Sequence, residues 1–188
     1  MATTSLPLST LSAWDIDPTH SGVHFAVKHL MVSTVRGEFG KVAGSIDLDP
    51  EDITRSRIHA VIDAASINTR QAQRDVHLRS PDFLDVERHP TIEFRSTRLT
   101  RTGEGFEAAG DLTIRGITRP VTLRVETSET ELIDPFGNLK RGASASARIS
   151  RKEFGLEWNV ALETGGFLVG DEVKIEIDIE LVRRGGSA

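Results

Sequence analysis

Apolar and polar residues alternate along most of the chain, a pattern typical of β-strands with one dry and one wet face. The last predicted strand is the clearest, because Val173, Ile175, Ile177, Ile179 and Leu181 alternate with charged residues. Similar runs predict strands over 23–28, 42–48, 58–64, 92–94, 106–114, 121–125 and 143–149. The pattern therefore predicts an all-β fold of roughly eight antiparallel strands, arranged as a sandwich or a barrel.

A helical pattern interrupts the strands near residues 69–84. Asn68 is expected to cap this helix, with Gln71 in the capping-box position. Ala72 and Val76 are four residues apart and share one helical face, as in an amphipathic helix. A helical segment between two strands is expected at the mouth of a barrel.

Several strands carry small residues on the face that should be apolar. These residues are Gly44, Ala60, Ala64, Ala108, Gly110, Ala143, Ala145 and Ala147. Because protein interiors are closely packed, small wall residues can leave a cavity, and an eight-stranded barrel is wide enough for one small ligand. They can equally allow sharp curvature of the sheet. The pattern alone supports both interpretations.

Length and composition restrict the class of protein. With 188 residues the chain fits one domain, and its net charge of -5 disfavours a nucleic-acid partner or an anionic membrane surface. The absence of cysteine excludes disulfides and thiolate chemistry. No stretch approaches the length of a transmembrane helix, so we expect no stable membrane insertion.

The expected domain organisation is simple. Residues 1–13 contain no Lys or Arg and are expected to form a flexible leader instead of a signal peptide. Residues 14–183 are expected to form a single domain, and residues 184–188 a flexible tail. The sequence thus predicts a cytoplasmic protein.

Candidate catalytic chemistry is sparse. The six histidines have no metal-ligand spacing such as HExxH, so we expect no metal. Asp82, Asp85 and Glu87 suggest acid–base carboxylates, but Arg79 and Arg88 supply nearby charge partners. There is no GxSxG nucleophile motif and no phosphate-binding loop. The sequence therefore favours a protein that is not an enzyme.

A polar group is expected at the mouth of the barrel. It consists of Arg74, Asp75 and His77 from the helical segment, together with His20. These side chains either gate a cavity or pin the helix and its turns to the strands. His20 also ends an Asp-Pro-Thr-His run, which predicts a tight turn.

Several motifs together resemble the YceI-like, polyisoprenoid-binding family, over about residues 14 to 182. The motifs are Asp17-Pro18-Thr19-His20-Ser21, Val23-x-Phe25-x-Val27-Lys28-His29-Leu30-Met31-Val32-Ser33, Val35-Arg36-Gly37-x-Phe39, Ile67-x-Thr69, Arg74-Asp75-x-His77-Leu78-x-Ser80-x-Asp82-Phe83-Leu84, Pro90-x-Ile92-x-Phe94, Gly110-x-Leu112-Thr113-Ile114-Arg115-Gly116-Ile117-Thr118 and Arg151-x-x-Phe154-Gly155. Each is weakly specific alone, but their order along the whole chain is highly specific.

The resemblance implies an eight-stranded antiparallel barrel of lipocalin-like shape with an apolar tunnel. It also implies an isoprenoid ligand, such as a quinone or a polyprenyl chain, and a homodimer. The sequence departs from the family pattern in two places. The signal peptide of many periplasmic members is absent, and His89 replaces an aromatic residue, commonly Tyr, before Pro90.

The leading hypothesis is a non-enzymatic protein that binds, stores or transports an isoprenoid-type lipid, with no other cofactor. The expected ligand-binding residues are Phe25, Val27, Phe39, Ile62, Phe83, Phe94, Leu112, Ile114, Ile175 and Ile177. One alternative is a hydrolase or isomerase for a small hydrophobic substrate, with His20 or His77 as the base. Another is a stress-response module whose cavity is incidental.

Overall fold

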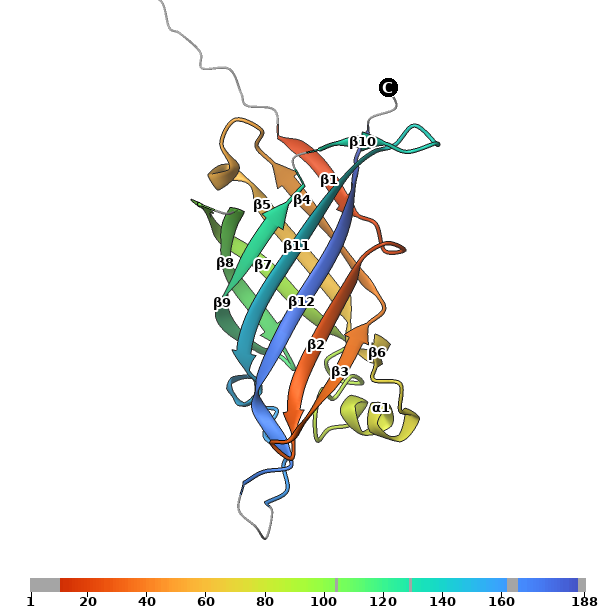
Figure 1. Cartoon of the computed structure of the whole chain (residues 1–188), viewed down its shortest axis with the longest axis vertical. Coiled ribbons are helices and arrows are strands. Elements are labelled where there is room, and N and C mark those ends of the chain that lie inside the picture. Colours follow the sequence, from red (N-terminus) through yellow and green to blue (C-terminus); the bar gives the residue numbers. More distant parts are fainter. Residues whose placement is uncertain (1–10, 104, 129, 162–165, 186–188) are drawn as a thin grey trace, which may run out of the picture.

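The protein is an antiparallel β-barrel with one short α-helix (Figure 1). The computed structural model describes residues 11–103, 105–128, 130–161 and 166–185. The strands are β1 (Ser12–Ile16), β2 (Gly22–His29), β3 (Ser33–Phe39), β4 (Val42–Leu48), β5 (Arg57–Asp63), β6 (Ile67–Asn68), β7 (Thr91–Thr102), β8 (Gly105–Ile114), β9 (Ile117–Thr127), β10 (Leu132–Ile133), β11 (Leu139–Ser150) and β12 (Val169–Arg183). The helix is α1 (Ala72–Arg79), and short 3-10 turns lie at Ile53–Arg55, Ala64–Ser66 and Arg151–Phe154.

The pairing of β12 with β11 closes the sheet. On its other edge, β12 pairs with β1 near its C-terminal end and with β2 near its N-terminal end. In the same way β4 pairs with β1 and β3 pairs with β2, so these four strands fill two positions of the barrel. With β5, β7, β8, β9, β11 and β12 they make a closed barrel of eight strand positions. The expectation of an eight-stranded antiparallel barrel is confirmed.

Besides the two-residue strands β6 and β10, two strands lie where the alternation predicted none. β1 begins at Ser12, inside the predicted leader, and it places Trp14 opposite Ile46 of β4. β3 contains Gly37, where an added Cβ would lie 2.4 Å from Cζ of Phe25. A short strand or a glycine within a strand gives a weak alternation signal, which explains why both were missed. Of the predicted leader and tail, residues 1–10 and 186–188 lie outside the described residues.

Helix α1 is capped and oriented differently from the prediction. Gln71, not Asn68, is the N-cap, and its side chain accepts a hydrogen bond from the Arg74 amide. Asn68 instead accepts one from the Arg70 amide. Val76 is 66% exposed, whereas Asp75 is buried. The helix therefore turns its apolar face to solvent and a carboxylate inward, which periodicity alone predicts in reverse.

The barrel is filled at one end and open at the other. Among the described residues, Trp14, Leu99, Ala108 and Leu181 are buried at the end where β1 meets β12. At the opposite end, α1 lies beside β6 (Figure 1). No helix in the described ranges has both the length and the apolar character needed to cross a bilayer. The interior opens at the end near α1, where Gln71, Arg74 and His77 of the helical segment line it.

Candidate functional site

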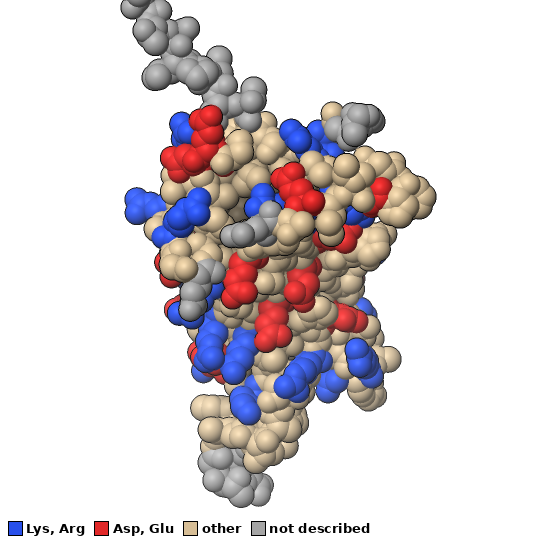
Figure 2. All heavy atoms as spheres, turned by 45° about the horizontal axis from the view of Figure 1, so that its top comes forward, with Lys and Arg blue, Asp and Glu red and all other residues tan. Residues whose placement is uncertain are grey.

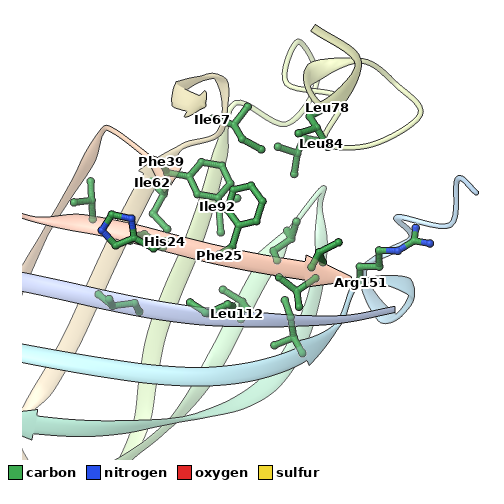
Figure 3. A pocket seen from close by; sticks show the side chains of 18 of the residues that line it. His24, Phe25, Phe39, Ile62, Ile67, Leu78, Leu84, Ile92, Leu112 and Arg151 are labelled. Atoms are coloured by element: carbon green, nitrogen blue, oxygen red, sulfur yellow. The ribbon is translucent and has the colours of Figure 1, made fainter. Parts of the chain in front are cut away.

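The interior holds an apolar cavity of about 700 Å³. Small-molecule sites have volumes of roughly 300–1,000 Å³, so this one can enclose a substantial ligand. In Figure 3, Phe25, Phe39, Ile62, Ile92 and Leu112 point into the cavity, and Leu78 and Leu84 lie near its end. The polar residues of the lining include Gln71, Gln73, Arg74 and His77 of the helical segment, together with Arg151, His24, His29 and Ser144.

All ten residues that the sequence assigns to ligand binding line this cavity. They are Phe25, Val27, Phe39, Ile62, Phe83, Phe94, Leu112, Ile114, Ile175 and Ile177. Nine of them come from the inward-facing positions of β2, β3, β5, β7, β8 and β12, and Phe83 comes from the turn that follows α1. Their contact with a ligand stays a prediction.

The small residues on the apolar face have two different structural roles. Ala60, Ala143 and Ala145 line the cavity, and their short side chains leave space inside it. At Gly110, in contrast, an added Cβ would lie 2.4 Å from the Arg95 carbonyl oxygen, so glycine permits close approach of β7 and β8. Ala108 is fully buried in the filled end. The first interpretation therefore holds for part of the set, while close strand approach accounts for Gly110.

The Arg74–Asp75 pair pins the start of α1. One oxygen of the buried Asp75 carboxylate accepts hydrogen bonds from the Thr69 amide, at 2.9 Å, and from the Thr69 hydroxyl, at 2.5 Å. Arg74 Nε donates to the same hydroxyl at 2.7 Å, and Arg74 Nη2 donates to the Thr69 carbonyl at 2.9 Å. Asp75 thus acts in the turn, while Arg74 also lines the cavity.

His77 lines the cavity within an aromatic cluster. Its ring centroid lies 5.0 Å from that of Phe83 and 4.6 Å from that of Trp158, both edge-on. Its Nε2 atom lies 2.9 Å from a carboxylate oxygen of Asp82. These contacts hold the imidazole in place beside the opening.

Two arginines fix the helical segment to the barrel. Arg79 donates to the carbonyl oxygens of Ala65 and Ile67, at 2.8 and 2.6 Å. Arg115 donates to the carbonyls of Gly155 and Pro81, at 2.6 and 2.8 Å. Arginine forks of this kind satisfy backbone carbonyls that turns leave free. The rim of the cavity is therefore built on charged hydrogen bonds.

His20 does not lie with the mouth residues, contrary to the prediction. Its Nδ1 atom is 3.0 Å from an oxygen of Asp17 and 3.6 Å from an oxygen of Glu180, outside the apolar cavity. The physical reason is the tight turn of residues 17–20, which places the ring on the outer surface of the barrel, beside β12. Lys140 Nζ lies 3.1 Å from Asp17 and also contacts Glu180. A metal ion between these groups would have to compete with the lysine ammonium.

The Asp17 network predicts a pH-dependent contribution to stability. The Thr19 hydroxyl, His20 and the Thr19 amide all bond the Asp17 carboxylate and hold its pKa well below the ordinary range, with a smaller effect from Lys140. Because the folded pKa is lower than the unfolded value of about 3.9, the contribution is present at neutral pH and is lost in acid. Asp17→Asn should lower the free energy of unfolding by about 1–2 kcal/mol at pH 7.

This difference should shrink as the pH falls from about 5 to about 2, because protonation removes the advantage of the carboxylate. Urea unfolding of both proteins across that range measures it, and Glu107→Gln, at an exposed carboxylate of β8, is the control, whose stability difference from the wild type should stay constant with pH. A difference that stays constant with pH would contradict the role assigned to Asp17.

Sequence reasoning missed the segment between β11 and β12. Leu156, Trp158, Leu168 and Val169 all line the cavity, although no alternation marks them. Their place depends on Arg151, which is buried and donates hydrogen bonds to the carbonyls of this segment. A bulky Trp in a short irregular stretch after Gly155 was the available signal.

Comparison with known proteins agrees with the geometry. A YceI-like domain model matches residues 14–181. A UPF0312 protein of Staphylococcus aureus (strain N315) is 35% identical over 170 residues, which cover 90% of this chain and 97% of the relative.

Two solved structures share the fold. BcnA of Burkholderia cenocepacia has a TM-score of 0.74 at 22% identity, covering 88% of this chain and 98% of that one. A polyisoprenoid binding domain from Saccharophagus degradans has a TM-score of 0.66 at 12% identity, covering 90% and 98%. With the barrel, the cavity and a family match over nearly its whole length, the chain belongs to the YceI-like family.

Proposed function

We propose that the protein binds, stores or transports an isoprenoid-type lipid, a polyprenyl chain or an isoprenoid quinone, without catalysing a reaction. The observation that carries this proposal is an apolar cavity of about 700 Å³ inside the barrel, with four polar residues of the helical segment, Gln71, Gln73, Arg74 and His77, beside its opening. The fold shared with a domain whose name includes polyisoprenoid binding adds support. Homodimer formation and a cytoplasmic location stay predictions.

The energetics favour an apolar chain. Burial of each methylene gains about 0.8 kcal/mol, so a few isoprene units provide strong binding even after the loss of chain freedom is subtracted. Such a cavity selects its ligand by length and width, whereas Gln71, Gln73 and Arg74 can reach only a group at the opening. A lipid with a polar head at one end matches this arrangement.

Organic extraction of freshly purified protein, followed by mass spectrometry, tests the proposal. We expect a prenyl lipid in near-stoichiometric amount, or uptake of added ubiquinone by protein that is purified empty. Protein that is repeatedly empty and also fails to take up quinone or polyprenol would overturn the proposal.

His77 distinguishes a carrier from an enzyme. Among the histidines, it is best placed to act as a base, because it lines the cavity and contacts Asp82. In a carrier, His77→Gln should retain the lipid, with His59→Gln, on the outer surface, as the matched control. Conversion of the extracted lipid or of added quinone by the wild-type protein, lost in His77→Gln alone, would favour the enzyme.

A further inference from the structure

Exposed apolar side chains project from the open end of the barrel. They are Met31 (74% exposed), Val32 (83%), Val160 (46%) and Phe167 (54%), which we call the apolar tip. Met31 and Val32 belong to the turn between β2 and β3, and the other two flank the segment that leads into β12. Clusters of exposed apolar residues on a soluble protein indicate a binding surface.

The parts of the apolar tip are joined to each other and to the cavity. The Leu30 amide donates to the Leu168 carbonyl at 2.9 Å, and the Leu168 amide donates to the Val160 carbonyl at 3.0 Å. Leu168 itself lines the cavity, as does His29 at the end of β2. The β2–β3 turn and the start of β12 lie together at the lower end of Figure 1. The tip therefore stands beside the opening.

The β2–β3 turn has an unfavourable sequence for a turn in water. Leu30 and Met31 both adopt left-handed backbone angles, with φ of 51° and 60°. Bulky residues are strained in this region, whereas Asn and Gly adopt it readily. Because the turn gains little from burial, these side chains are better explained by an apolar partner.

A row of cations crosses the outer surface next to the tip. Arg148 of β11 lies directly opposite Lys174 of β12. On the other side of Lys174 the same row continues with Ala26 of β2 and then Arg36 of β3. Like charges opposite each other on neighbouring strands destabilise a sheet, so the row does not serve the fold. Arg148 contacts Glu172 at 3.2 Å, but within the described ranges Lys174 and Arg36 have no acidic group within 4.0 Å.

Both signs of charge occur near the tip. The exposed acids Asp171 and Glu172 already have partners, since Asp171 accepts hydrogen bonds from the Ser150 hydroxyl and the Lys152 amide, and Glu172 lies 3.2 Å from Arg148. Lys28 is exposed one row nearer the tip, and Lys152 Nζ lies 5.5 Å from the centre of the Phe167 ring. The next row toward the middle of the barrel is acidic, with Glu176 and Glu38. Figure 2 shows Lys and Arg gathered near the lower end, below a group of Asp and Glu. The net charge of -5 is thus spread unevenly over the surface of the protein.

We propose that the open end docks reversibly on a lipid bilayer that contains anionic lipids. Met31, Val32 and Phe167 enter the boundary between head groups and acyl chains, while Arg36, Lys152 and Lys174 face lipid phosphates. Each such cation near an anionic membrane strengthens binding about fivefold. This proposal runs against the expectation from the net charge, and it brings the opening of the cavity to the membrane. It deepens the proposed function, on which its purpose rests.

Flotation of the intact protein with vesicles tests the docking. We expect binding to phosphatidylcholine vesicles that contain phosphatidylglycerol, little binding to pure phosphatidylcholine, and release at about 0.5 M salt. The double variants Met31→Ser/Phe167→Ser and Arg36→Gln/Lys174→Gln should each lower binding at least about tenfold. Phe136→Ser removes an even more exposed Phe (88%) from the opposite end and should bind like the wild type.

Three results would overturn the proposal: no flotation of the wild type, an equal loss in Phe136→Ser, or binding only to membranes that contain protein. The last would assign the apolar tip to a protein partner. Because all substituted side chains are exposed, thermal unfolding should be almost unchanged. Flotation of protein that yields no prenyl lipid on extraction and also takes up no quinone or polyprenol would sustain docking while refuting the carrier. Protein that binds a prenyl lipid but does not float would sustain the carrier while refuting docking.

Discussion

Replacing Ala145 by Phe should abolish binding of a prenyl lipid while leaving the barrel folded. Ala145 lines the cavity from β11, between Val125 of β9 and Ile177 of β12. A ring at this position extends into empty space instead of into packed neighbours, so we expect the free energy of unfolding to change by less than about 1 kcal/mol. At about 0.8 kcal/mol for each displaced methylene, the loss of two methylenes already weakens binding about tenfold.

Titration of wild type and variant with ubiquinone measures this effect. Ser146→Phe is the matched control, because Ser146 is the next residue of β11, exposed on the outer face opposite Glu176. It should bind like the wild type. Equal affinity of Ala145→Phe and the wild type would mean that the ligand lies outside the cavity.

Replacing Arg151 by Met should have the largest effect on stability. The guanidinium is only 4% exposed and donates to the carbonyls of Gly170 and Trp158, both at 2.9 Å, of Val169 at 3.3 Å, and of Leu156. Burial lowers the pKa of Arg151, although arginine stays charged at neutral pH. A buried carbonyl without a partner costs about 1–3 kcal/mol, so we expect a total loss of about 3–5 kcal/mol.

Denaturant unfolding monitored by tryptophan fluorescence checks this value, since Trp158 is held by the same side chain. Lys152→Met provides the control, because Lys152 is exposed and its substitution should change stability by less than about 0.5 kcal/mol. A loss below about 1 kcal/mol in Arg151→Met would show that water replaces the guanidinium, and that the segment does not depend on it.

The barrel and the wall of its cavity were predictable because alternation is a local property. Once β2, β5, β8 and β12 are recognised, parity decides which side chains face inward, and residues such as Phe25 and Ile175 follow. The family resemblance then favoured a barrel over a sandwich. This part of the site needs no knowledge of long-range contacts.

The polar rim was less predictable because tertiary contacts decide it. Val76 is exposed and Asp75 is buried, because Thr69 donates hydrogen bonds to the Asp75 carboxylate. Helical periodicity does not reveal such a partner. His20 was misplaced because its turn lies at the outer edge of β12, 160 positions away in the chain. Trp158 lies in an irregular segment whose path depends on a buried arginine. The pattern of residues along the chain does not indicate these long-range partners.

The filled end of the barrel has a kinetic consequence. Among the described residues, Trp14, Leu99 and Leu181 occupy that end, so we expect a ligand to leave the cavity through the same opening by which it entered. Withdrawal into water slows about fourfold for every additional methylene, so residence time rises steeply with tail length. Ligands with longer tails would therefore stay bound for long periods in solution, and they would leave rapidly only where the opening contacts an apolar phase.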